Sequence, residues 1–129
     1  MTKQAYIGIK YYKDNRNQPE ITQLSRQLEQ SGYKTVCIAR DVEKWGAVHL
    51  PPSELMLHTF TEIDRSDLIV MEMSEKGVGL GIEAGYAYAK GKYLLIVLKN
   101  ERELSSTMAG IASKIIRYQS LEQLNLSNL

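Results

Sequence analysis

The sequence predicts an α/β fold, a doubly wound sheet of five parallel strands with helices on both faces. Two observations lead to this prediction. Short apolar runs alternate along the whole chain with segments that have helical periodicity or typical helix ends. Strands that alternate with helices are joined by crossover connections, which make neighbouring strands parallel. Because 129 residues are enough for one domain and not two, we expect a single domain over residues 1–129.

Each strand is predicted from a short run of apolar residues. The runs cover, in chain order, residues 5–9, 35–39, 68–71, 93–98 and 114–118. Lys10 ends the first run. The fourth run contains five consecutive apolar residues, 94–98, and this continuity is typical of a strand that is buried on both faces.

Each helix is predicted from apolar spacing or from the residues at its ends. The helices are expected over residues 20–31, 53–65, 79–90 and 105–113, with a last helix from Ser120. In the first helix, Ile21, Leu24 and Leu28 lie on one face, and Gly32 follows where a left-handed C-cap belongs. Ser53 is expected to be the N-cap of the second helix. The long polar segment 40–52 is predicted to be a functional or mobile loop.

Composition excludes several classes of protein. Sixteen Lys and Arg residues against fifteen Asp and Glu give a net charge of +1, which argues against a nucleic-acid partner. The single cysteine, Cys37, excludes a disulfide framework and a Cys-type zinc site, and we expect it to be a small buried apolar residue. The longest apolar run is too short to cross a membrane, and the N-terminus does not resemble a signal peptide. We therefore expect a cytoplasmic protein without a metal site or a membrane partner.

The predicted architecture indicates where a ligand would bind. In open α/β sheets the binding site lies at the carboxyl ends of the strands. The segments expected to border it are residues 9–15, 40–52, 73–83 and 99–106.

A glycine-rich segment in this region carries the clearest sign of chemistry. Gly77, Gly79 and Gly81 stand at alternate positions, which permits close approach of a ligand to the backbone. Glu83 is expected in the first helical turn, where the helix dipole stabilises a carboxylate. Such a carboxylate suits a nucleophile or the stabiliser of an oxocarbenium ion. An alternative interpretation is that the glycines serve tight packing and that Glu83 only stabilises the helix.

Other proteins of this architecture are disfavoured by the same segments. Residues 79–84 fit the dinucleotide-binding pattern, with Glu101 about 20 residues further on, but they follow the third strand instead of the first. A phospho-receiver domain needs acidic residues after the first strand and an Asp after the third. This chain has a lysine and two tyrosines at residues 10–12 and Ser74 at the second place. A flavodoxin needs a hydroxyl-rich phosphate loop after the first strand, and this loop is basic and aromatic.

Residues 67–70, 77–87 and 91–92 resemble the nucleoside 2-deoxyribosyltransferase family, which includes the 2'-deoxynucleoside 5'-phosphate N-hydrolases. The resemblance runs from about residue 6 to residue 124 and is densest over 67–92. It implies a flavodoxin-like fold with strand order 2-1-3-4-5. It also implies cleavage or exchange of the N-glycosidic bond of a nucleoside or its 5'-monophosphate, without a cofactor.

The resemblance also implies roles for individual residues. Glu83 matches the nucleophilic glutamate that forms a covalent glycosyl-enzyme intermediate. Ser105 matches a residue that family members contribute to the neighbouring subunit's site, which implies at least a homodimer. Residues 6–13 match the first-strand loop that holds the phosphate in the hydrolases. The substrate-binding residues expected from the whole pattern are Gly8, Lys10, Tyr11, Asp67, Gly77, Gly79, Gly81 and Ser105.

The chain also departs from the family pattern. The hydrolases have an arginine-containing run after the first strand, where this chain offers Lys10 and Lys13, which meet a phosphate only as point charges. Gly77 stands where many transferases have an Asp that reads the base, and Thr59 stands where the family has an Asp near the reacting sugar. The residues that would substitute for that Asp are His58, Glu62 and Asp64.

Two functions therefore stay open from the sequence. One is an N-glycosidase with Glu83 as its nucleophile; the other is a nucleotide- or ribosyl-binding module that has lost catalysis. The candidates to stack on a base are Tyr11, Tyr12, Trp45 and Tyr86, although core packing is an alternative for each of them.

Overall fold

The computed structural model describes residues 2–127 and 129, and within them the strands form one parallel five-stranded sheet. The strand order is β2-β1-β3-β4-β5, as the sequence predicts. The strands are β1 (Lys3–Gly8), β2 (Tyr33–Val36), β3 (Leu68–Glu72), β4 (Tyr93–Lys99) and β5 (Lys114–Tyr118). Every residue of β3 is buried, because this strand lies in the centre of the sheet and has helices over both faces.

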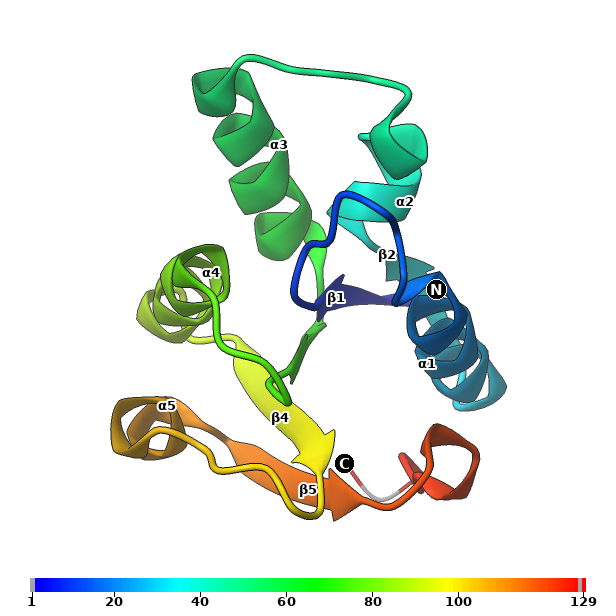
Figure 1. Cartoon of the computed structure of the whole chain (residues 1–129). Coiled ribbons are helices and arrows are strands. Elements are labelled where there is room, and N and C mark those ends of the chain that lie inside the picture. Colours follow the sequence, from blue (N-terminus) through cyan, green and yellow to red (C-terminus); the bar gives the residue numbers. More distant parts are fainter. Residues whose placement is uncertain (1, 128) are drawn as a thin grey trace.

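Helices cover the two faces of the sheet unequally (Figure 1). The helices are α1 (Gln18–Gln30), α2 (Ile38–Asp41), α3 (Pro52–Arg65), α4 (Val78–Ala89) and α5 (Ser106–Ile111), with the 3-10 turns η1 (Lys44–Gly46) and η2 (Leu121–Gln123). One face carries α1 and η2, whereas the other carries α3, α4 and α5. This arrangement confirms the predicted doubly wound architecture.

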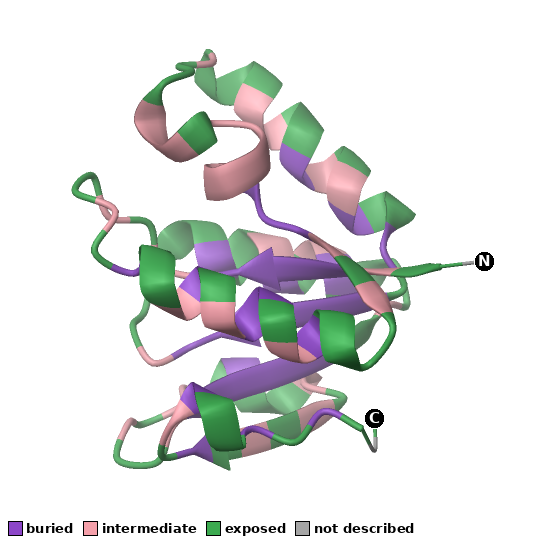
Figure 2. Cartoon of the chain, turned by 90° about the vertical axis from the view of Figure 1, so that its right-hand side faces the viewer, coloured by how far each residue is buried: buried purple, intermediate pink, exposed green. Residues whose placement is uncertain are grey.

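The core consists of two apolar layers, one on each side of the sheet. Alternate residues of a strand point to opposite faces, so Ile7 and Val70 pack in the layer of α1. Tyr6 and Met71 point the other way, into the layer of α3 and α4. Figure 2 shows the buried strands between helices whose outer faces are exposed. Tyr6 is thus aimed at the face of the sheet that carries α4.

The segment after β2 differs from its prediction. The second strand was expected to reach residue 39, but it ends at Val36 because Ile38 already begins α2. The carboxylate of Asp41 accepts a hydrogen bond from the backbone N–H of Cys37 at 2.9 Å and stabilises the start of this short helix. The predicted irregular loop 40–52 is therefore partly ordered into α2 and η1.

Two predicted helix ends are also wrong. Ser53 is not an N-cap, because α3 begins one residue earlier at Pro52, which has the fixed φ that suits a first helical position. The last helix, expected from Ser120, is only the single turn η2. The left-handed residue after α1 is confirmed, since Gly32 has φ +94°.

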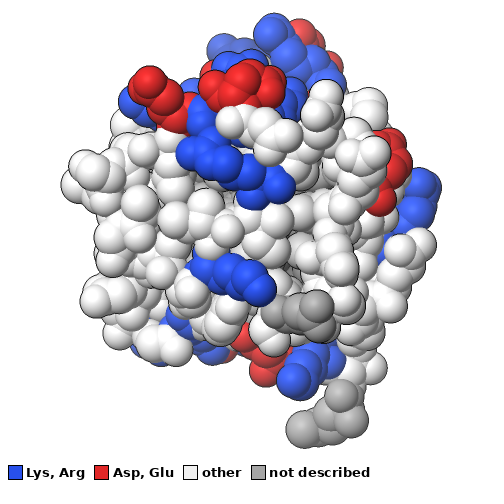
Figure 3. Space-filling model, turned by 90° about the horizontal axis from the view of Figure 1, so that it is seen from below, with Lys and Arg blue, Asp and Glu red and all other residues white. Residues whose placement is uncertain are grey.

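Neither a membrane-spanning helix nor a continuous basic patch is seen in the parts of the molecule described next. None of the helices in the described part of the chain is long and apolar enough to cross a membrane. On the face around β5 and α5, the Lys and Arg side chains lie in separate groups with uncharged surface between them (Figure 3).

Candidate active site

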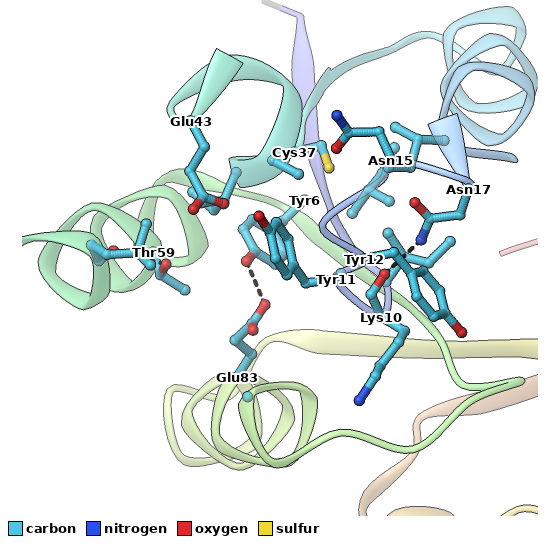
Figure 4. Close-up of a pocket in the computed structure, with 18 of the residues that line it drawn as sticks. Tyr6, Lys10, Tyr11, Tyr12, Asn15, Asn17, Cys37, Glu43, Thr59 and Glu83 are labelled. Atoms are coloured by element: carbon cyan, nitrogen blue, oxygen red, sulfur yellow. Dashed lines mark hydrogen bonds between the residues drawn. The ribbon is translucent and has the colours of Figure 1, made fainter. Parts of the chain in front are cut away.

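A pocket of about 410 Å³ lies at the carboxyl edge of the sheet, where the sequence predicts a ligand site. Its walls are the end of β1 and the following loop, the α2–η1 segment, the first turns of α3, and α4 (Figure 4). Of the predicted site residues, the structure brings Glu83, Gly8, Lys10, Tyr11 and Gly79 to this pocket.

Glu83 and Tyr6 form the central polar pair of the pocket. The Tyr6 hydroxyl donates a hydrogen bond to Oε1 of Glu83 at 2.5 Å. Tyr6 belongs to β1 and is almost fully buried, whereas Glu83 reaches the pocket from α4. Because the buried phenol holds one carboxylate oxygen in place, the orientation of Glu83 is fixed before any ligand binds.

Burial makes Glu83 an unusual carboxyl group. Desolvation raises the pKa of Glu83 from 4.5 to about 7, and the hydrogen bond from Tyr6 opposes this rise. The sequence placed Glu83 in the first helical turn, but α4 begins at Val78, so Glu83 lies in the second turn. Since the effect of the helix dipole falls off beyond the first turn, the Tyr6 hydroxyl replaces it as the main local stabiliser of the charge.

Two glycines lie against the Glu83 carboxyl group. A Cβ atom on Gly8 would be 3.4 Å from Oε1 of Glu83 and 2.4 Å from Sδ of Met71. A Cβ atom on Gly79 would be 3.6 Å from Oε2 of Glu83. The absence of side chains at these two positions therefore leaves the carboxylate open to the pocket.

Polar groups gather at the end of the pocket next to α1. Asn17 donates a hydrogen bond from Nδ2 to the backbone oxygen of Lys10 at 2.5 Å and so shapes the loop after β1. Lys10 lines this pocket and also a neighbouring one of about 260 Å³, to which Arg16 and Lys99 contribute. Gly77 lies beside this lysine, because its Cβ atom would be 3.5 Å from Cδ of Lys10. A positive charge thus stands where the two pockets meet.

The opposite end of the pocket is mostly apolar. Ile38, Leu55 and Met56 line it together with Thr59, whose hydroxyl donates to the backbone oxygen of Leu55 at 2.9 Å. Glu43 also lines the pocket, and burial raises its pKa. In Figure 4 the carboxyl groups of Glu43 and Glu83 point into the pocket from opposite sides.

An uncommon backbone turn borders the pocket next to Glu43. Lys44 and Trp45 have φ values of 50° and 59°, which non-glycine residues rarely adopt, and Asn15 in the facing loop has φ 55°. Asn15 donates a hydrogen bond from Nδ2 to the backbone oxygen of Trp45 at 2.9 Å. Strained residues of this kind cluster at functional sites.

Several predicted site residues lie elsewhere. Asp67 is at the amino end of β3, where its carboxylate accepts a hydrogen bond from the backbone N–H of Gln4 at 2.9 Å. Gly81 is exposed on α4, with no atom within 4 Å of a Cβ added there. Ser105 is the N-cap of α5 and accepts a hydrogen bond from the N–H of Met108.

The residues proposed to replace the family aspartate do not line the pocket either. His58 is exposed, and Glu62 lies 3.5 Å from Arg65 on the same helix. Asp64 accepts a hydrogen bond from the Tyr86 hydroxyl at 2.8 Å. Tyr86 in turn stacks on Phe60, so this aromatic residue has a packing role. Tyr11, Tyr12 and Trp45, in contrast, line the pocket.

Neither Tyr6 nor Glu43 is singled out by the sequence as a site residue. The sequence predicts Tyr6 only as part of an apolar strand and of the segment 6–13, and its position two residues before Gly8 is the signal that both residues point to the same face of the sheet. Glu43 lay within a segment predicted to border the site, but nothing in its local sequence distinguishes it from the other charged residues there. Among the described residues no group of three or more His, Cys, Asp or Glu residues could hold a metal ion.

Comparison with known proteins gives one sequence match. No family model matches the chain. A nucleoside deoxyribosyltransferase of Lactobacillus leichmannii is 34% identical over 56 residues. The match covers 41% of this chain and 36% of that enzyme, so only about a third of the relative's length corresponds to this protein.

Solved structures of similar fold extend over almost the whole chain. The CMP N-glycosidase BcmB of Clostridium botulinum has a TM-score of 0.69 at 17% identity, with 94% of this chain and 93% of that chain covered. A 2-deoxyribosyltransferase of Bacillus psychrosaccharolyticus has a TM-score of 0.71 at 10% identity, with 96% and 93% covered. The sequence match together with these shared folds supports the resemblance to the nucleoside 2-deoxyribosyltransferase family.

Proposed function

We propose that this protein cleaves or exchanges the N-glycosidic bond of a nucleoside or a nucleoside 5'-monophosphate, with Glu83 as the nucleophile. The observation that carries the proposal is the Glu83 carboxyl group, held by Tyr6 at 2.5 Å inside the pocket at the carboxyl edge of the sheet. The local match to a nucleoside deoxyribosyltransferase and the fold shared with a CMP N-glycosidase agree with this reaction class.

The proposed reaction is a double displacement. A carboxylate oxygen of Glu83 attacks C1' of the sugar, the bond between C1' and the base nitrogen breaks, and the base leaves with the electron pair and takes up a proton. Water or a second base then attacks C1' and releases Glu83, with loss of a proton from the attacking group. Tyr6 is a positioning residue, because its hydrogen bond aims one oxygen and leaves the other free to react.

The pocket supports a nucleotide as well as a nucleoside. Lys10 is the cation that lines the pocket, and its Nζ would attract a 5'-phosphate. Arg16 and Lys99 line the adjoining pocket together with Glu20, Glu72 and Glu75, so the attraction for a phosphate rests on Lys10. A sugar placed with C1' next to Glu83 would then direct its 5'-end toward Lys10.

We also propose that the protein works as a homodimer or a larger homo-oligomer with shared active sites. Val78 and Ile82 lie one turn apart on α4 and expose 83% and 49% of their surface. Such an apolar helix face favours contact with a partner. Ser105, which is outside the described pocket, would then serve the site of a neighbouring subunit.

A binding module without catalysis is the second candidate. Thr59 stands where the family has an Asp, and its hydroxyl is already used in a hydrogen bond to the backbone oxygen of Leu55. A threonine hydroxyl does not act as a general acid at neutral pH. This candidate predicts stabilisation by nucleotides without release of a base.

The experiment that tests the proposal is base release. The protein is incubated with ribo- and deoxynucleosides and their 5'-monophosphates, with and without a free acceptor base, and chromatography measures the liberated or exchanged base. We expect release with at least one substrate class and its loss in Glu83→Gln. Glu54→Gln is the matched control, because Glu54 is exposed outside the pocket and should leave the rate unchanged. Full activity of Glu83→Gln would refute the proposal, and binding without release by the unmodified protein would favour the binding module.

A further inference from the structure

Where the base would lie in the pocket follows from the stereochemistry of the proposed displacement. A nucleophile and the group it displaces occupy opposite faces of the sugar carbon. Glu83 enters the pocket from α4, so the leaving base would face the wall on the other side, which α2, η1 and α3 form. This wall offers Ile38, Leu55 and Met56, whose apolar side chains suit the flat faces of a nucleobase.

Glu43 is the charged side chain of that wall. The other charged residues that line the pocket are Lys10 and Glu83, which belong to the loop after β1 and to α4. The carboxyl group of Glu43 points into the pocket (Figure 4). No hydrogen bond or ion pair joins it to any side chain or backbone group in the described part of the chain.

An unpartnered carboxylate in this position is free to accept a hydrogen bond from a ligand. Burial of the Glu43 side chain raises its pKa, and His49 lies close enough to oppose the rise by its charge. Thr59 does not donate a hydrogen bond to the Glu43 carboxylate, because its hydroxyl donates to the backbone oxygen of Leu55. An ionised carboxylate accepts hydrogen bonds and donates none, so it distinguishes donors from acceptors on whatever faces it.

The backbone around Glu43 is held in place. Its carbonyl oxygen accepts hydrogen bonds from the N–H groups of Gly46 at 2.9 Å and Val48 at 3.0 Å. The two left-handed residues that follow it, Lys44 and Trp45, are tied to the facing loop through Asn15. The restrained turn therefore fixes the backbone from which the Glu43 side chain reaches the pocket, and a ligand donor would fix the carboxylate itself.

We infer that Glu43 reads the nucleobase and selects bases that carry an exocyclic amino group. The inference rests on the proposed function and names the substrate class for that site. The amino groups of cytosine and adenine donate hydrogen bonds to a carboxylate. Uracil and hypoxanthine present a carbonyl oxygen at the same position, which would meet the Glu43 carboxylate as a second acceptor and leave both unpaired.

Binding to a protein that does not turn over the ligand tests this inference directly. In a Glu83→Gln background, dissociation constants are measured for the 5'-monophosphates of cytidine and uridine, and of adenosine and inosine. Each pair differs by an amino group against a carbonyl oxygen. Trp45 is the only tryptophan of the chain and lines the pocket, so its fluorescence reports binding, and titration calorimetry provides an independent measurement.

We expect the amino-bearing member of at least one pair to bind at least about tenfold more tightly. Its amino group donates a hydrogen bond to the charged Glu43 carboxylate, and the carbonyl oxygen of the other member does not. Glu43→Gln should bring the ratio to within about twofold, since its amide both donates and accepts. Glu43→Asp keeps the charge and shortens the side chain, so it should reduce the ratio without inverting it. Glu54→Gln, an equal change of charge on the exposed first turn of α3, should leave the ratio unchanged.

The outcomes separate this inference from the proposed function. An equal ratio in the Glu43→Gln and parent proteins, or no preference in the parent, would overturn the inference. Loss of affinity for all four nucleotides to the same extent would also overturn it, because Glu43 would then act on a part common to all of them. If the unmodified protein releases no base but binding is selective and depends on Glu43, the proposed glycosidase activity is refuted and base selection by Glu43 is supported.

Discussion

Replacement of Glu83 by Gln is expected to stabilise the folded protein at high pH while it abolishes the proposed reaction. Glutamine has the shape of glutamate, and its Oε1 accepts the hydrogen bond from Tyr6. It carries no charge, so burial no longer costs the free energy of desolvating a carboxylate. The effect of the substitution on stability should therefore depend on pH in a way that a purely structural role of Glu83 would not produce.

The magnitude follows from the pKa of Glu83, which is about 7 in the folded protein against 4.5 for an exposed glutamate. Between these two pH values the folded state holds a proton that the unfolded chain releases, so the free energy of unfolding falls as pH rises. Each pH unit corresponds to about 1.4 kcal/mol, and the whole interval to about 3 kcal/mol. This is an upper limit, because the side chain is not fully buried and water screens part of the cost.

The assay is denaturant unfolding of both proteins at several pH values from 4 to 8. We expect the Glu83→Gln variant to gain up to about 3 kcal/mol over the parent between pH 4.5 and pH 8, on top of any difference present at pH 4. Glu54→Gln, which changes an exposed carboxylate, should follow the parent at every pH. Parallel curves for Glu83→Gln and the parent would show that the carboxyl group is not desolvated as described.

Further predictions concern the neighbours of Glu83. Tyr6→Phe removes a hydrogen bond that lowers the pKa of Glu83, so the acidic limb of the pH–rate profile should move above pH 7 and the rate at pH 7 should fall about tenfold; an unshifted limb would contradict this role. Gly8→Ala should destabilise the fold by about 1–3 kcal/mol in denaturant unfolding, because its Cβ would lie 2.4 Å from Sδ of buried Met71. Lys10→Gln should weaken binding of 5'-monophosphates about fivefold or more while nucleoside binding stays unchanged, as measured by calorimetry; equal losses for both ligands would rule out a phosphate contact.

The sheet was predictable from the sequence, and the segment after β2 was not. Apolar runs mark buried parallel strands whatever their neighbours, so five strands form where they are predicted, and their order is the one that the family resemblance implies. Residues 37–39 are equally apolar, but a short apolar run does not distinguish a strand from a buried helical turn. The side chain of Asp41 accepts a hydrogen bond from the N–H of Cys37 and so stabilises the helical turn.

The site was predictable where one segment carries it and not where two distant segments meet. Glu83 and the loop with Lys10 follow from local patterns and from the family resemblance. The contact between Tyr6 and Glu83 joins residues 77 positions apart and depends on strand direction and helix placement together. Asp67 was expected at the site from the family pattern alone. In the structure it lies at the amino end of β3, where its carboxylate accepts a hydrogen bond from the backbone N–H of Gln4 in β1.

The lining of the pocket includes the only thiol of the protein. Cys37 is 2% exposed, and burial raises its pKa to about 11. A thiolate is the species that reacts with alkylating reagents, so the buried Cys37 should react slowly and only through transient openings of the structure around it. The rate of its alkylation, followed by mass spectrometry, therefore measures how often the wall formed by β2 and α2 opens. Since each molecule takes up a single label, no protein engineering is needed to time that motion.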